Sequence, residues 1–253
     1  MSDPIIYVLD FDGVICESVK ETAITGWNAA SSIWGDMPRT VPQEKIEQFR
    51  LVRPIIETGY EAILTMRLLY LEETIEAIYN NYSEKFKVLI DDANLTVGGL
   101  KQLFGDTRDA WIKNDANDWI NMNPLYDGIV AKLKALGQHC PWYIVTTKHE
   151  RFVKLILHAN GIELAEDQLY GLDRNMSKTE AIKELLKSHP GETLYFVEDR
   201  LPTLLNIIRN GEIPDVKLIF ASWGYNRPGD KELAKQYDVT VQNLETFLAP
   251  FMA

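Results

Sequence analysis

Cysteine is scarce in this sequence, and long apolar runs are missing. The 253 residues include only Cys16 and Cys140, which lie far apart and form no Cys-x-x-Cys pair. A disulfide framework and a thiolate metal site are therefore not expected. No apolar run approaches the length of about 18 residues that spans a membrane, and the first residues lack the basic region of a signal peptide. We predict an intracellular, cytoplasmic protein.

An excess of positive charge is also absent. Lys and Arg number 26 against 37 Asp and Glu, so the formal net charge is −11. Binding to nucleic acid or to an anionic membrane requires a basic surface, so neither is expected as a partner. A small anionic substrate is not excluded, because a few local cations and a metal ion can override the net field. Oligomeric state is left open.

What the chain does have is an alternation of strands and helices. The apolar run Ile5–Leu9 is typical of a strand buried on both faces of a parallel sheet. Further strands are expected at 142–146, 194–197, 216–221 and 238–241, and helices at 126–136, 150–160, 177–188, 202–210 and 243–247. This alternation predicts an α/β fold with a doubly wound, Rossmann-like parallel sheet.

The stretch between the first two strands has a different pattern. It shows no convincing strand, and apolar residues recur at helical spacing, for example over a predicted helix at 60–79. A helix is also expected at about 17–34. We therefore predict an α/β core made of residues 1–16 and 123–253, with an all-helical domain, residues 17–122, inserted after the first strand.

Two acids follow the first strand directly. Asp10 ends the strand and Asp12 lies in the loop beyond it, where Gly13 permits a tight turn. Ligands of open parallel sheets bind beyond the carboxyl ends of the strands. The arrangement suits phosphoryl transfer through an aspartyl-phosphate, with Asp10 as nucleophile and Asp12 as proton donor and acceptor. An ordinary acidic turn after a strand remains the alternative at this point.

Three further motifs follow in order. They are Ile144-Val145-Thr146, Ser177-Lys178-Thr179 and Tyr195-Phe196-Val197-Glu198-Asp199, after Asp10-Phe11-Asp12-Gly13-Val14. Together they resemble the haloacid dehalogenase (HAD)-like hydrolase superfamily. The resemblance is to its phosphatases with an inserted helical cap domain, and most of all to the phosphoglycolate-phosphatase-like branch. The second acid, Asp12, favours phosphate chemistry over dehalogenation.

The resemblance implies roles for single residues. Asp10 is implied as the nucleophile, Asp12 as the general acid and base, and Thr146 as a ligand of the phosphate oxygens. Lys178 is implied as the cation that neutralises Asp10 and the phosphate, although spacing alone does not choose it over Lys183.

The resemblance also implies a metal site. Asp199 would bind the ion, Glu198 would do so directly or through water, and Asp10 and the Asp12 carbonyl would complete the protein ligands. All of these donors are oxygens and no His or Cys cluster accompanies them, so Mg²⁺ is the expected cofactor.

Contacts to the rest of the substrate are suggested at three residues. Thr147 stands where relatives often carry Asn, close to the leaving group. Arg50 and Arg53 lie at a predicted helix break in the inserted domain and can clamp a second anionic group. Salt bridges within that domain explain both arginines equally well.

These observations predict an enzyme, a phosphoric monoester hydrolase that uses Mg²⁺ to hydrolyse a small phosphorylated metabolite. A phosphomutase, which shares the first half-reaction, is the nearest alternative, and a dehalogenase is a weaker one. A non-catalytic binding or regulatory protein on the same fold is the alternative from another class.

Overall fold

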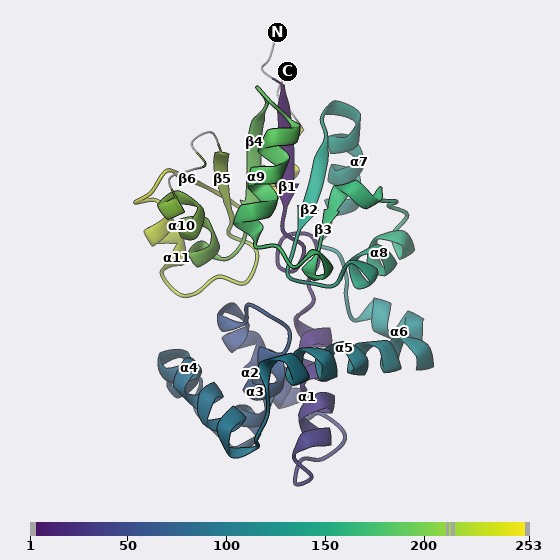
Figure 1. The fold of residues 1–253 in the computed structure, drawn as a ribbon, viewed down its shortest axis with the longest axis vertical. Helices are drawn as coiled ribbons and strands as arrows, with labels where there is room; N and C mark the ends of the chain where they lie inside the picture. The colour runs from purple at the N-terminus through teal and green to yellow at the C-terminus, as the bar shows by residue number, and fades with distance from the viewer. Residues whose placement is uncertain (1–3, 211–212, 214–215, 251–253) are drawn as a thin grey trace. The chain divides into compact units, whose positions relative to one another are not determined.

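The computed structural model describes residues 4–210, 213 and 216–250, and it divides into two compact units (Figure 1). The first unit contains the described residues up to Glu17 and those from Leu125 onward, and the second unit is Ser18–Pro124. Within the described residues, no helix combines the length and apolar character needed to cross a membrane.

The first unit is built on a sheet of six parallel strands. They are β1 (Ile5–Leu9), β2 (Trp142–Val145), β3 (Leu169–Tyr170), β4 (Thr193–Glu198), β5 (Val216–Ala221) and β6 (Val239–Gln242). Their order across the sheet is β3-β2-β1-β4-β5-β6, and every pairing is parallel. The predicted α/β class and parallel sheet are confirmed. Strand β3 was not predicted, because two residues are too few to show a periodicity.

Helices cover both faces of this sheet. They are α7 (Ile129–His139), α8 (Glu150–Ala159), α9 (Lys178–Ser188), α10 (Leu201–Asn210), α11 (Asp230–Ala234) and α12 (Leu244–Leu248). Apolar residues of α9, α10 and α11, such as Ile182, Leu204 and Ala234, share one core cluster with Val8 and Phe196 of the sheet. Crossovers between parallel strands are right-handed. The connections through α7 and α8 step toward β3, whereas those through α9, α10 and α11 step toward β6, so α7 and α8 cover the opposite face of the sheet.

The topology fixes where a ligand can bind. The chain leaving β1 returns to the sheet at β2, whereas the chain leaving the neighbouring strand β4 returns at β5 on the other side. The carboxyl ends of β1 and β4 therefore form the switch point at which open α/β sheets bind ligands. Leu9 is in register with Val197, so Asp10 and Glu198 follow side by side at this edge.

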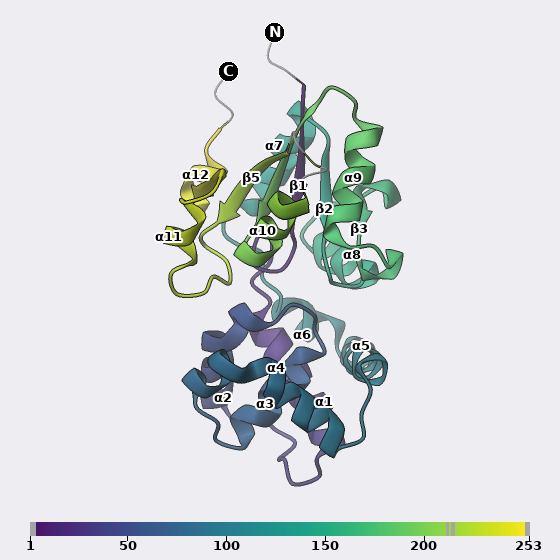
Figure 2. The same cartoon turned by 60° about the vertical axis from the view of Figure 1, so that its left-hand side comes forward.

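The second unit is helical. Its elements are α1 (Val19–Ile33), α2 (Gln43–Val52), the 3₁₀ turn Arg53–Ile55, α3 (Glu61–Tyr70), α4 (Ile75–Asp92), α5 (Val97–Asn114) and α6 (Ala116–Asn121), most of which Figure 2 labels. The described residues 18–124 contain no strand.

The prediction of one continuous helix over 60–79 was wrong. Helix α3 ends at Tyr70, Glu72 adopts the left-handed conformation with φ 61°, and Thr74 caps α4 by accepting a hydrogen bond from the Ala77 N–H at 3.1 Å. A short turn of this kind leaves the apolar spacing almost in phase, so periodicity alone does not reveal it.

The other boundaries agree to within a few residues. Helix α7 begins at Ile129 and not at 126, because Gly128 is left-handed, with φ 83°, at the N-cap. Helix α11 was not predicted at all. Gly211, the residue that follows the predicted helix 202–210, lies outside the described residues.

Candidate active site

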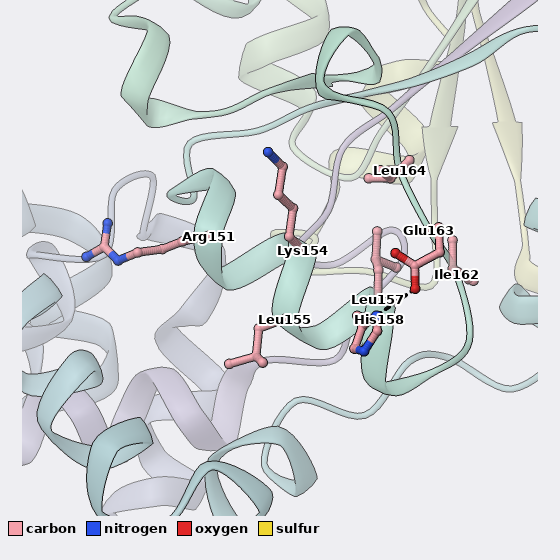
Figure 3. A pocket seen from close by; sticks show the side chains of 8 residues that line it. All are labelled: Arg151, Lys154, Leu155, Leu157, His158, Ile162, Glu163 and Leu164. Carbon is pink, nitrogen blue, oxygen red and sulfur yellow. Dashed lines mark hydrogen bonds and ion pairs between the residues drawn. The ribbon is translucent and has the colours of Figure 1, made fainter.

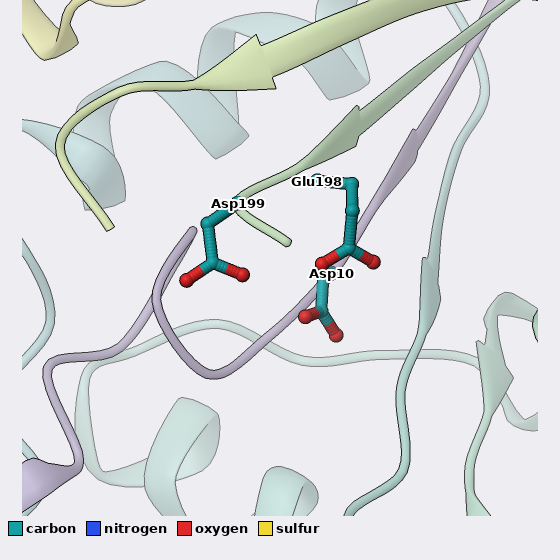
Figure 4. A group of neighbouring side chains, drawn as sticks. All are labelled: Asp10, Glu198 and Asp199. Atoms are coloured by element: carbon teal, nitrogen blue, oxygen red, sulfur yellow. The ribbon is translucent and has the colours of Figure 1, made fainter. Parts of the chain in front are cut away.

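Three buried carboxylates meet at the carboxyl ends of β1 and β4. Asp10, Glu198 and Asp199 each offer an oxygen within 4.8 Å of the others, and none is more than 5% exposed (Figure 4). Asp10 continues β1, since its N–H donates to the Val197 carbonyl at 2.9 Å. Parallel pairing thus delivers residues from opposite ends of the sequence to one place.

Two glycines allow the chain to pack around Asp199. Gly13 is left-handed, with φ 91°, and a Cβ added there would overlap the Asp199 carboxylate. A Cβ on Gly224, in the loop after β5, would overlap both Asp199 and the Gly13 carbonyl. The loop after β5 also binds Asp199 directly, because the Tyr225 N–H donates to its Oδ2 at 2.5 Å. Sequence reasoning missed this loop, although a glycine just beyond a strand was a signal for it.

Lys178 reaches the same group from the start of α9. Ser177 and Glu180 form a capping box, which fixes the first turn of this helix. The Lys178 Nζ lies 2.9 Å from Asp10 Oδ1 and 2.6 Å from Glu198 Oε2. Of the two lysines that spacing left open, Lys178 is the one that contacts Asp10.

Burial and shared charge decide the ionisation of this group. Burial raises the pKa of Asp10 to about 7, although Lys178 opposes the shift. Burial alone would lower the pKa of Lys178, but Asp10 and Glu198 outweigh it and hold that pKa above its usual range. Burial would raise the pKa of Glu198, yet Lys178 and the Arg200 N–H lower it. Lys178 is thus shared between the two carboxylates, and burial still leaves the pKa of Asp10 above its ordinary value.

The donor chemistry of this cluster fits a hard divalent cation. Three acids and one ammonium leave an excess of negative charge, and every candidate ligand atom is a carboxylate oxygen. Such oxygens are the ligands that Mg²⁺ prefers. Both oxygens of Glu198 already accept hydrogen bonds, one from Lys178 and one from the Arg200 N–H, so Asp10 and Asp199 are the better placed ligands.

The remaining predicted residues of the core lie beyond β1 and β2. Asp12 is anchored through Oδ1 by the Nζ of Lys148 at 3.0 Å. Thr146 is 6% exposed and donates its N–H to the Tyr170 carbonyl, and Thr147 is half-buried. Lys148 was missed by sequence reasoning. A cation only two residues beyond the predicted strand 142–146, at the edge that carries the acids, was the available signal.

The two arginines belong to the helical unit and have partners there. Arg53 is 7% exposed and donates to the Ile56 carbonyl at 2.9 Å. Arg50 is exposed and lies 3.7 Å from Glu47. A substrate contact by either arginine stays a prediction.

A separate hollow lies on α8 (Figure 3). Its lining includes His158 and Glu163, whose Nδ1 and Oε1 lie 2.6 Å apart, the apolar Leu155 and Ile162, and Lys154. None of the clustered carboxylates contributes to it.

Solved structures share this fold. A predicted phosphatase from Clostridium acetobutylicum matches with a TM-score of 0.60 at 14% identity, over 98% of this chain and 97% of that one. A predicted phosphoglycolate phosphatase from Haemophilus somnus gives 0.57 at 19% identity, over 89% and 88%. A hydrolase of the haloacid dehalogenase-like family from Streptococcus pneumoniae gives 0.56 at 18%, over 96% and 95%.

The fold is therefore that of the HAD-like hydrolases, and the resemblance predicted from the motifs is confirmed at the level of the fold. No family model and no curated protein matches the sequence.

Proposed function

We propose that the protein is a Mg²⁺-dependent phosphatase that hydrolyses a small-molecule phosphate monoester through an aspartyl-phosphate. The observation that carries the proposal is the contact of Lys178 with Asp10, 2.9 Å long, inside a buried acidic cluster at the switch point of the sheet. Structural neighbours described as phosphatases support the same chemistry.

In the first step an Asp10 oxygen attacks phosphorus. The bond from phosphorus to the ester oxygen breaks, and its electron pair stays on that oxygen. Asp12 donates a proton to it, so the product leaves as a neutral alcohol. The ammonium of Lys178 and the hydroxyl and neighbouring N–H groups of Thr146 stabilise charge on the phosphoryl oxygens.

In the second step water cleaves the intermediate. Asp12, now ionised, takes a proton from the water as its oxygen attacks phosphorus. The bond between phosphorus and Asp10 breaks, and the electron pair returns to the carboxylate. Phosphate leaves and Asp10 is ready for another turn.

Asp10, Asp199 and the main-chain carbonyl of Asp12 would hold the Mg²⁺, with Glu198 beside them. When bound, the ion supplies positive charge that keeps Asp10 ionised and offsets the charge of the phosphate. The helical domain, expected at 17–122, would act as the cap that supplies substrate specificity, with Arg50 and Arg53 as candidate contacts. Thr147 of the α/β core is a further candidate contact, beside the leaving group.

A phosphatase screen with Mg²⁺ tests the proposal. Small phosphorylated acids come first, because a neighbour is described as a phosphoglycolate phosphatase. Asp10→Asn should lower kcat/KM at least ~1000-fold, since losing ~4 kcal/mol of transition-state stabilisation has this effect. Free phosphate as the product, and not an isomerised sugar phosphate, separates hydrolysis from phosphomutase chemistry. Equal turnover by wild type and Asp10→Asn would refute the mechanism.

A further inference from the structure

We propose that Lys148 is a positioning residue for the general acid, fixing the Asp12 carboxylate toward the leaving-group oxygen. The inference rests on the proposed phosphatase function and adds to it a residue that none of the four motifs assigns. Two lysines contact different acids of the site. Lys178 contacts Asp10 and Glu198, whereas Lys148 contacts Asp12.

The Lys148 side chain is buried at the edge of the site. The residue is 3% exposed, and its Nζ lies 3.0 Å from Asp12 Oδ1 and 5.7 Å from the centre of the Phe11 ring. Lysine is almost never fully buried unless it is paired. The side chain is thus committed to the loop that carries both acids of the first motif.

The backbone of Lys148 is fixed as well. Its N–H donates to Thr146 Oγ1 at 3.2 Å, and its carbonyl accepts from the Leu172 N–H at 3.0 Å. A Cβ on Gly171 would lie 2.9 Å from that carbonyl, so the close approach of the two loops depends on glycine.

The loop after β3 fixes the next two residues also. The Asp173 carboxylate accepts the Glu150 N–H at 2.7 Å and lies 2.7 Å from His149 Nδ1. Lys148 is therefore presented from a rigid base, as precise positioning of a catalytic group requires.

Stability alone is a weak explanation for this arrangement. Ordering a lysine side chain costs up to ~2 kcal/mol, and a buried ion pair often contributes little net stability after desolvation. What the contact with Lys148 does provide is a fixed orientation of the Asp12 carboxylate. A carboxylate anchored through one oxygen cannot rotate freely about its Cβ–Cγ bond, so its other oxygen keeps one orientation.

This role has a chemical signature. A poor leaving group, such as an alkoxide, needs the proton that Asp12 delivers, whereas 4-nitrophenolate leaves without it. General acid catalysis contributes ~10²- to 10⁴-fold. Misdirecting Asp12 should therefore slow alkyl phosphates far more than 4-nitrophenyl phosphate. A defect in folding or in Asp10 would slow both esters by the same factor.

The experiment compares kcat for the two esters in Lys148→Met, Lys148→Arg and Lys154→Met. The control Lys154→Met is the same change on α8, at a residue that lines the separate hollow of Figure 3. In Lys148→Met we expect the alkyl ester to lose at least ~30-fold more than 4-nitrophenyl phosphate. Lys148→Arg should recover part of that difference because it keeps the charge, and Lys154→Met should change neither rate.

Equal losses for the two esters in Lys148→Met, or no loss, would overturn the positioning role. If Lys148→Met does not fold, the same ratio in Lys148→Gln decides. A different result would refute the proposed phosphatase mechanism itself, namely phosphate release that persists in Asp10→Asn.

Discussion

Asp10 is buried at the carboxyl end of β1, and this burial changes how its carboxyl group ionises. An ordinary Asp is ionised at neutral pH, but burial raises the pKa of Asp10 to about 7. Because Lys178 is shared with Glu198, a further cation nearby would favour the ionised form of Asp10, the proposed nucleophile. This dependence links the chemistry of one side chain to the metal proposed beside it.

A pH-dependent stability follows for the metal-free protein. The folded-state pKa of Asp10 lies above its unfolded value of 3.8, so its contribution is full below about pH 4 and is lost as the pH rises through about 7. In EDTA at pH 8, Asp10→Asn should thus be more stable than wild type by at least ~1 kcal/mol, about 2–4 °C in Tm. The gain should vanish near pH 4.

Thermal unfolding at both pH values measures this. Asp238→Asn, at an exposed position before β6, is the matched control and should behave like wild type. An Asp10→Asn protein that is less stable than wild type at pH 8 would show that ionised Asp10 is favoured by the fold.

At the scale of elements, a buried ion pair joins three helices of the helical unit. Glu21 of α1 is fully buried and accepts two hydrogen bonds from Arg108 of α5, at 2.8 and 2.7 Å. Thr25 of α1 and Trp119 of α6 donate hydrogen bonds to the same carboxylate, at 2.7 and 3.1 Å respectively. All of these hydrogen bonds are made by charged or polar groups that are buried away from water, so removing one partner would leave another buried group unpaired at a high energetic cost.

Breaking this pair should be costly. Glu21→Gln leaves the Arg108 guanidinium buried without its counter-charge, and we expect a loss of ~3–5 kcal/mol in the free energy of unfolding. Glu47→Gln is the matched control on α2, where the exposed carboxylate lies 3.7 Å from Arg50, and it should cost less than ~1 kcal/mol. Urea denaturation gives both values. A similar loss of unfolding free energy in Glu21→Gln and Glu47→Gln would contradict the stabilising role of the buried ion pair.

At the scale of the whole molecule, the sheet is what assembles the site. The acids come from residue 10 and from residues 198–199, and the loop after β5 adds the Tyr225 N–H to Asp199. A metal ion at this point would bridge β1 and β4, so its binding should stabilise the fold of the α/β unit.

Metal removal tests that bridge without an activity assay. Mg²⁺ at ~100 times its Kd should stabilise wild type by ~2.7 kcal/mol over the EDTA-treated protein, and Ca²⁺ serves as a comparison ion. Asp199→Asn should abolish most of this gain, whereas Asp238→Asn should retain it. If Mg²⁺ stabilised wild type, Asp199→Asn and Asp238→Asn equally, the ion would have to bind at another site.

The sequence determined the fold class and pointed to the neighbourhood of the acids. Apolar strands alternating with amphipathic helices are local patterns, and acids directly after strands 5–9 and 194–197 are brought together by any parallel sheet that pairs those strands. The cap of α9 by Ser177 and Glu180 was also readable, since all of its hydrogen bonds lie within four residues.

Only the tertiary structure decided the rest. The contact of Lys148 with Asp12 joins residues 136 positions apart, and the pKa of Asp10 depends on how completely the packed chain excludes water. The turn that divides 60–79 into two helices was decided by the left-handed Glu72 and the Thr74 cap, not by apolar spacing. Distances and burial are properties of the assembled chain, whereas periodicity and residue chemistry are already present in its sequence.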